Sequence, residues 1–226
     1  MPFQLYALLL TALWLAAVAI FFRTSRAVLI GGLVIVALCA LGAFLHGDAT
    51  PQDFGLGLPR SWLATLALAV VWLLLMLLYG PIADNIATRF FEKPPTLGAF
   101  RALQESRLKL VSGIVIAWVL GGFLEELVLR GIVLNAVEAL ARSSVTTWTA
   151  AGLGIAAAAG GAFIIHLYQG LRAATIVTQL SVLFGVLFVI SGGNLWTVIL
   201  CHGFYDTVAF IRFANKSSRY SHLDEA

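Results

Sequence analysis

Three apolar stretches of the sequence contain ionisable side chains well away from their ends. These side chains are Glu125, Glu126 and Arg130 in the first stretch, His166 in the second, and His202 and Asp206 in the third. Ionisable groups inside a membrane-spanning stretch are costly, and they usually mark a functional site. Carboxylate and imidazole groups together can also take a proton from water and make it a nucleophile. We therefore take these six residues as the candidate site.

Helical spacing groups these side chains further. Glu126 and Arg130 are four residues apart and would share one face of a helix, where they can form an internal ion pair. His202 and Asp206 have the same spacing, so that imidazole and carboxylate can meet. Glu125 lies about 100° round the helix from Glu126 and is left to face another polar partner or a water-filled cavity.

The composition indicates which elements must position this site. The chain has 226 residues, of which 61% are hydrophobic and 11% charged, and its net charge is +3. Soluble domains are roughly 45–50% apolar and about 25% charged, so we exclude a soluble enzyme and a nucleic-acid-binding domain. The small charge surplus also argues against a nucleic-acid partner. We expect an all-α, polytopic transmembrane helix bundle that lies in a lipid bilayer.

A spanning helix needs about 20 mainly apolar residues, and the sequence contains about seven such runs. They are Tyr6–Phe22, Ala27–Leu45, Trp62–Tyr79, Leu110–Leu134, Trp148–Tyr168, Ala173–Ser191 and Leu195–Phe213. We divide the chain into N-terminal transmembrane helices with a cytoplasmic loop (1–109), core helices that carry the candidate site (110–213) and a cytoplasmic tail (214–226). Residues 80–109 should form the longest extramembrane stretch, with one short interfacial helix.

The distribution of Lys and Arg predicts the orientation, because these residues favour the cytoplasmic side. With the N-terminus outside, eleven of the fourteen Lys and Arg residues fall in cytoplasmic segments, and only Arg60 and Arg142 fall outside. Trp62, Trp148 and Trp196 would then all begin spans at the outer interface, where Trp is enriched. Both signals predict an N-out, C-in topology.

Three short motifs follow one another in the second half of the chain. The first starts at Glu125 and reads Glu-Glu-Leu-Val-Leu-Arg, the second ends in His166, and the third starts at His202 and reads His-Gly-Phe-Tyr-Asp. In order, spacing and placement within apolar spans they resemble the motifs of the CPBP family, which comprises CAAX prenyl endopeptidases and bacteriocin-processing intramembrane proteases. The resemblance covers Val111–Phe213, about half of the chain.

The chain departs from the family pattern at two positions. Phe163 stands three residues before His166, where the family has Phe four residues before, and Ala162 occupies that place. This Phe would pack rather than react, so the difference matters little to the chemistry. The second departure is Asp206, where the prenyl proteases carry Asn. An ionised carboxylate would repel an oxyanion, so Asp206 must be protonated, orient His202 or bind a metal.

The resemblance implies an intramembrane endopeptidase that cleaves a peptide bond in a membrane protein or a lipidated peptide substrate. Glu125 and His166 would activate the attacking water, and His202 with Asp206 would stabilise the oxyanion. The ion pair at Glu126 would hold the site in shape, with the contribution of Glu126 to the chemistry left open. We expect an integral protein of a bacterial-type plasma membrane, although no motif in the sequence fixes the compartment.

A metal could also take part, because two His and two carboxylates are able to ligate Zn²⁺. The possible ligands are Glu125, His166 and His202. The soluble zinc-protease signature His-Glu-x-x-His is absent, however, and a Glu/His site can activate water without a metal. We favour metal-independent catalysis, and the choice between no cofactor and Zn²⁺ stays open.

Two other classes of function use charges inside a membrane. A proton-coupled transporter would place Glu, His and Arg side chains along a path, whereas here they cluster in three spans and no inverted repeat is visible. A non-catalytic scaffold would use polar groups to hold helices together, more often with Ser, Thr, Asn or Gln than with two adjacent Glu. Both remain alternatives to the protease.

The depths of the candidate residues disagree in the predicted spans. At 1.5 Å per residue, Glu125 lies about 14 Å and His202 about 11 Å from the outer ends of their helices, whereas His166 lies near the inner end of its own. A shared site therefore needs a shifted or tilted helix. We predict that the three side chains nevertheless meet in one cavity.

Overall fold

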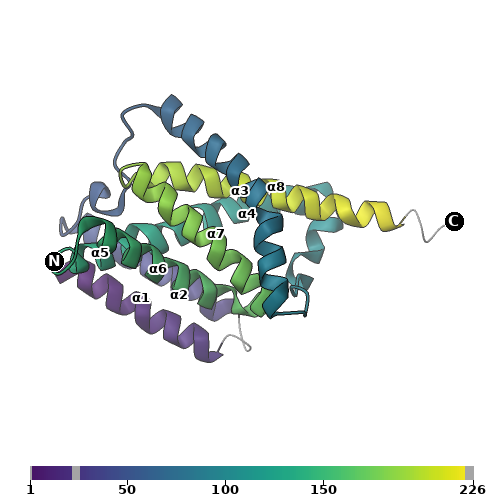
Figure 1. The fold of residues 1–226 in the computed structure, drawn as a ribbon, viewed down its shortest axis with the longest axis horizontal. Helices are drawn as coiled ribbons and strands as arrows, with labels where there is room; N and C mark the ends of the chain where they lie inside the picture. The colour runs from purple at the N-terminus through teal and green to yellow at the C-terminus, as the bar shows by residue number, and fades with distance from the viewer. Residues whose placement is uncertain (1, 22–25, 222–226) are drawn as a thin grey trace.

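The chain folds into a bundle of helices, and no strand occurs among residues 2–21 and 26–221, the part that this computed structural model describes. The helices correspond one to one with the predicted runs. They are α1 (Pro2–Phe21), α2 (Arg26–Leu45), α3 (Trp62–Phe90), the segment from α4 to α5 (Arg107–Ala141), α6 (Thr147–His166), α7 (Leu171–Ile190) and α8 (Leu195–Ser221). The predicted all-α bundle is confirmed (Figure 1).

Among the described residues, four helical segments are long and apolar enough to cross a membrane. They are Trp62–Phe90, Arg107–Ala141, Thr147–Gln169 and Leu171–Ile190, and shorter apolar helical stretches cover Ala7–Ile20 and Ile30–Leu45. Large apolar side chains such as Leu13, Leu63 and Leu78 are at least 70% exposed on the outside of the bundle. Lipid tails suit such a surface, and water does not. The N-out, C-in orientation and the further spans remain predictions.

Capping hydroxyls fix where several helices begin. Ser61 precedes α3, Ser106 precedes α4 and Thr146 precedes α6, and each accepts the backbone N–H of the residue three positions further on. Such caps satisfy donors that the first helical turn leaves free. The signals for these helix starts are therefore local in the sequence.

The third helix is longer than predicted. α3 passes through Pro81 and continues to Phe90, eleven residues beyond the predicted end at Tyr79. Proline removes a backbone hydrogen bond and bends a helix, and α3 changes direction along its length (Figure 1). Beyond the bend, Arg172 of α7 donates two hydrogen bonds of 2.9 Å to the carboxylate of Asp84. This contact joins α7 to the part of α3 that extends beyond the predicted apolar run.

The helical segment that carries the Glu-Glu motif has an irregular middle. It starts as α4 (Arg107–Ala117), passes through two π-helical stretches, η3 (Trp118–Glu125) and η4 (Leu127–Leu134), and ends as α5 (Asn135–Ala141). π-helical turns are rare in proteins as a whole, and many of those that occur are found at functional sites. The segment is also longer at both ends than the predicted span over 110–134. The depth of Glu125 that was counted from the end of that span is therefore inaccurate.

Small residues bring α6 against η4. A Cβ atom on Gly154 would lie 2.8 Å from the backbone oxygen of Leu134, and one on Gly161 would lie 2.8 Å from the side chain of Leu129. Only glycine allows such a close approach. At the other end of α6, Gly170 takes a φ of +95° in the turn that leads into α7. The sequence thereby packs α6 closely beside the Glu-Glu motif.

The helix that carries the third motif packs against α3 and η3. A Cβ atom on Gly203 of α8 would lie 2.5 Å from the ring of Trp118, whose Nε1 donates to the hydroxyl of Thr207 over 3.0 Å. α8 continues to Ser221 and projects beyond the other helices (Figure 1), so helix covers the first part of the predicted tail. Residues 222–226 of that tail lie outside the described residues.

Candidate active site

A cavity of about 690 Å³ lies among the helices that carry the three motifs. Its polar lining includes Glu125, His166, His202 and Asp206. Much of the remaining wall is apolar and comes from α1, α2, η2 (Gly98–Gln104), α4, η3, α6 and α8, through Val18, Leu33, Phe100, Leu103, Ile116, Leu120, Ile165 and Phe210. The structure thus places four of the six candidate residues around one space, although their predicted depths differ.

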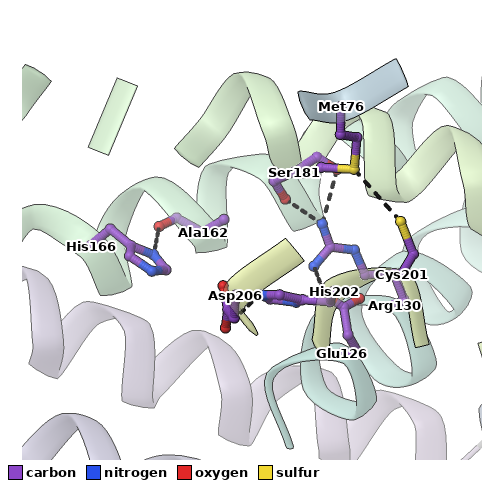
Figure 2. Close-up of polar contacts among 9 residues, drawn as sticks. All are labelled: Met76, Glu126, Arg130, Ala162, His166, Ser181, Cys201, His202 and Asp206. Atoms are coloured by element: carbon purple, nitrogen blue, oxygen red, sulfur yellow. Dashed lines mark hydrogen bonds and ion pairs between the residues drawn. The ribbon is translucent and has the colours of Figure 1, made fainter. Parts of the chain in front are cut away.

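The other two candidates, Glu126 and Arg130, lie behind the cavity wall. Their side chains are 0% and 1% exposed. The Nη1 group of Arg130 donates to Glu126 Oε1 over 3.1 Å. Its Nη2 group donates to the backbone oxygen and to the hydroxyl of Ser181 over 2.9 and 2.6 Å (Figure 2). The ion pair expected from the spacing is therefore present, and α7 completes its hydrogen bonding.

The carboxylate oxygen of Glu126 that binds Arg130 also holds His202. The Nδ1 atom of His202 lies 2.6 Å from Glu126 Oε1 and donates to it as an N–H. The second oxygen, Oε2, has no hydrogen-bond partner among the described residues. Hydrogen bonds to an ionised carboxylate are the short and strong ones. Glu126 therefore ties the first motif to the third across two helices.

His202 stands further from Asp206 than from Glu126. Its Nε2 atom lies 3.6 Å from Asp206 Oδ2, which is within ion-pair range and beyond hydrogen-bond length. A Cβ atom on Gly121 would lie 2.9 Å from that Asp206 oxygen and 3.5 Å from His202 Nε2. Gly121 also lines the cavity. The absence of a side chain at this position keeps the space beside Nε2 open.

His166 is the last residue of α6, and its ring is held from the helix itself. Its Nδ1 atom lies 2.9 Å from the backbone oxygen of Ala162 (Figure 2). A carbonyl oxygen only accepts, so Nδ1 carries the hydrogen in this contact, and a neutral ring then offers Nε2 as an acceptor. The ring of Tyr168 stacks beside it with centroids 6.3 Å apart. His166 is thus oriented for accepting a hydrogen bond.

The described residues contain no group of three or more His, Cys, Asp or Glu side chains that could hold a metal ion. Glu125, His166 and His202, the possible ligands named from the sequence, share the cavity without forming such a group. The arrangement therefore gives no support to that ligand set, and we derive no chemical step from a metal.

The second half of the chain matches a known family. The model for the type II CAAX prenyl endopeptidase Rce1-like family matches residues 107–208. These residues form an Rce1-like domain. The match confirms, for these residues, the predicted resemblance to the CPBP family of intramembrane proteases. The Rce1-like domain begins at the first residue of α4 and ends within α8, so it contains all six candidate residues. No curated protein and no solved structure matches the chain significantly.

The Rce1-like domain supports, in general terms, an integral membrane protein and a CAAX-type endopeptidase. The match leaves α1, α2 and α3 outside it. Two of these helices nevertheless contribute to the cavity, because Val18 of α1 and Leu33 of α2 line its wall. The space around the candidate residues is therefore built by more of the chain than the Rce1-like domain alone.

Two further residues of the Rce1-like domain touch the site and were not predicted. Ser181 accepts both hydrogen bonds from Arg130 Nη2. The ring of Phe184 stacks on His202. Neither residue is ionisable, and α7 resembles a lipid-facing helix in composition. A search of the sequence for charges within apolar runs therefore does not find these two residues. The only sequence signal is the three-residue spacing that puts Ser181 and Phe184 on one helical face.

Proposed function

We propose that this protein hydrolyses a peptide bond of a membrane-associated substrate in its cavity, with Glu125 as the general base. The observation that carries the proposal is the common cavity of Glu125, His166, His202 and Asp206. Of the two adjacent Glu residues, Glu125 is the one available to a substrate. Glu126 is fully buried and already accepts from two other side chains.

Glu125 and His166 hold the attacking water between them. Because Nδ1 of His166 donates to Ala162, its Nε2 accepts one hydrogen of the water, and the Glu125 carboxylate accepts the other. As the water oxygen bonds to the carbonyl carbon, its proton moves to Glu125. Glu125 then delivers this proton to the leaving nitrogen, the C–N bond breaks, and the products are a carboxylic acid and an amine.

His202 stabilises the oxyanion of the tetrahedral intermediate. Its Nδ1–H is bound by Glu126, so an N–H at Nε2 requires the imidazolium form, with the positive charge between the carboxylates of Glu126 and Asp206. Asp206 orients the ring and balances its charge, and this is the role that we assign to it. A preorganised oxyanion donor of this kind contributes about 10²–10³-fold to the rate.

The substrate is a membrane protein or a lipidated peptide. The cavity wall beyond the polar residues is mainly apolar, which suits a substrate segment that is itself apolar or lipidated. We place the protein in a bacterial-type plasma membrane. Catalysis is metal-independent, so dialysis against a chelator should leave cleavage unchanged. Loss of cleavage with recovery on added Zn²⁺ would show a zinc enzyme instead.

The substitution Glu125→Gln tests the proposal, because Gln keeps the shape of Glu and cannot take a proton. The probe is an internally quenched peptide that ends in a prenylated Cys and three further residues, in detergent micelles. We expect its cleavage to fall about 10²–10⁴-fold. The matched control is Glu138→Gln in α5, whose carboxylate pairs with the exposed Arg142 over 2.6 Å. The control should cleave like the wild type, and undiminished cleavage by Glu125→Gln would overturn the assignment.

The natural substrate is identified by comparing membrane proteomes. Cells that carry wild-type protein should contain a shortened form of the substrate, whereas cells with the Glu125→Gln protein should accumulate its full-length form. The same comparison decides between a prenylated and an unmodified substrate, since mass spectrometry of the cut terminus records the modification.

A further inference from the structure

Phe184 of α7 contacts both of the side chains that donate to Glu126. Its ring stacks on the imidazole of His202, with centroids 4.7 Å apart and planes at 24°. The Cζ atom of Arg130 lies over the same ring, 5.4 Å from its centroid. Phe184 is 4% exposed and His202 is 9% exposed. Contacts between a cation and an aromatic ring are stronger where water is excluded, so the burial of these side chains strengthens both contacts of Phe184.

We propose that Phe184 is a positioning residue that sets the ring plane of His202, an inference that rests on the proposed function. Glu126 holds the imidazole at Nδ1, but a single hydrogen bond leaves the ring free to tilt about that contact. A ring stacked on one face of the imidazole removes this freedom. Phe184 thereby directs Nε2 of His202 into the cavity, where the oxyanion forms.

The position of Phe184 is itself fixed by the helix that carries it. Ser181 lies one turn earlier on the same face and accepts two hydrogen bonds from Arg130. One residue after Phe184, a Cβ atom on Gly185 would lie 3.0 Å from the side chain of Ile155 in α6. α7 is therefore anchored to the ion cluster and packed closely against α6, which leaves Phe184 little room to move.

Two Leu substitutions on α7 separate positioning from packing. Phe184→Leu removes the ring face and keeps an apolar side chain. Phe188→Leu is the matched control, because Phe188 is 2% exposed and lies one turn further along. Its ring approaches Gly55 and Gly193 rather than the site. With the quenched prenylated peptide, we expect kcat of Phe184→Leu to fall about threefold to tenfold at unchanged KM. Phe188→Leu should keep the kcat of the wild type.

The ring contact is also measured without any substrate. The chain contains four His residues, so His-labelled protein gives few ring signals in an NMR spectrum, and a His202→Gln variant assigns the one of interest. The ring current of Phe184 should shift the His202 ring protons upfield in the wild type. We expect Phe184→Leu to remove this shift, whereas Phe188→Leu should leave it in place.

The positioning role is overturned if the two Leu variants have equal kcat, or if the His202 signals of Phe184→Leu match those of the wild type. The proposed function fails in a different way, through cleavage that persists in Glu125→Gln. In that case the His202 signals still decide whether Phe184 sets the ring plane. The two ideas are therefore tested separately with the same set of proteins.

Discussion

Replacing Arg130 by Met removes the cation at the centre of the buried cluster. Its guanidinium makes one hydrogen bond to Glu126 and two to Ser181, and only 1% of its side chain is exposed. Removing one partner of a buried ion pair costs about 3–5 kcal/mol of folding free energy. His202 still donates to the abandoned carboxylate over 2.6 Å, so we expect a cost near the lower end, about 3 kcal/mol.

A double-mutant cycle shows whether this cost comes from the charge left behind. Glu126→Gln removes the charge that Arg130→Met leaves uncompensated, so the double variant should cost about 1–3 kcal/mol less than the sum of the two single variants. The free energy of unfolding is measured by titrating a denaturing detergent into mild micelles and following helical circular dichroism. The control is Arg142→Met, because Arg142 is 57% exposed and its pair with Glu138 should contribute less than about 1 kcal/mol.

The reasoning is refuted by either of two results. The first is a cost for Arg130→Met as small as that of Arg142→Met, which would mean that burial adds nothing to the pair. The second is strict additivity in the cycle, which would mean that the Arg130 and Glu126 side chains act independently in the folded protein.

Substitutions at Gly121 and Asp206 probe the space beside Nε2 of His202, with Gly122 as a control position. Gly121→Ala puts a Cβ atom 2.9 Å from Asp206 Oδ2, so kcat should fall at least about tenfold. The control Gly122→Ala makes only ordinary contacts of 3.5 Å, and its kcat should equal that of the wild type. Equal effects of the two Ala variants would contradict the assignment of this space to the oxyanion. Asp206→Asn keeps an acceptor for His202 and adds a donor, so kcat should stay within about tenfold, while Asp206→Leu should lose about a hundredfold. Inactive Asp206→Asn protein would show that the carboxylate charge is essential.

Helix positions could be predicted well from the sequence because the signal is local. A run of about 20 apolar residues is a property of one stretch of chain, and each predicted run contains or overlaps one observed helix. The helix ends were predicted less well: α3, the segment from α4 to α5 and α8 all extend beyond the predicted runs, and α3 continues eleven residues past Tyr79. The contact between Asp84 and Arg172, which lie 88 positions apart, supports the helix there.

The pairing within the candidate site was only partly predictable. The i,i+4 rule finds the pair of Glu126 with Arg130, because both lie on one helix. The same rule points His202 toward Asp206, yet the short contact of His202 is with Glu126, 76 positions away. Spacing along one helix carries no information about how two helices face each other. For the same reason Ser181 of α7 could not be foreseen as a partner of the cluster.

The order of synthesis gives the cluster a consequence for how the protein is made. Glu126 and Arg130 leave the ribosome early, Ser181 follows on α7, and His202 comes only with α8, the last of the described helices to be synthesised. A chain that has inserted all but this helix lacks the imidazole that donates to Glu126, and with it the oxyanion donor that we propose. Under the proposed function, a chain that has not yet inserted α8 is therefore expected to cleave no peptide bond, and activity begins with the insertion of this helix.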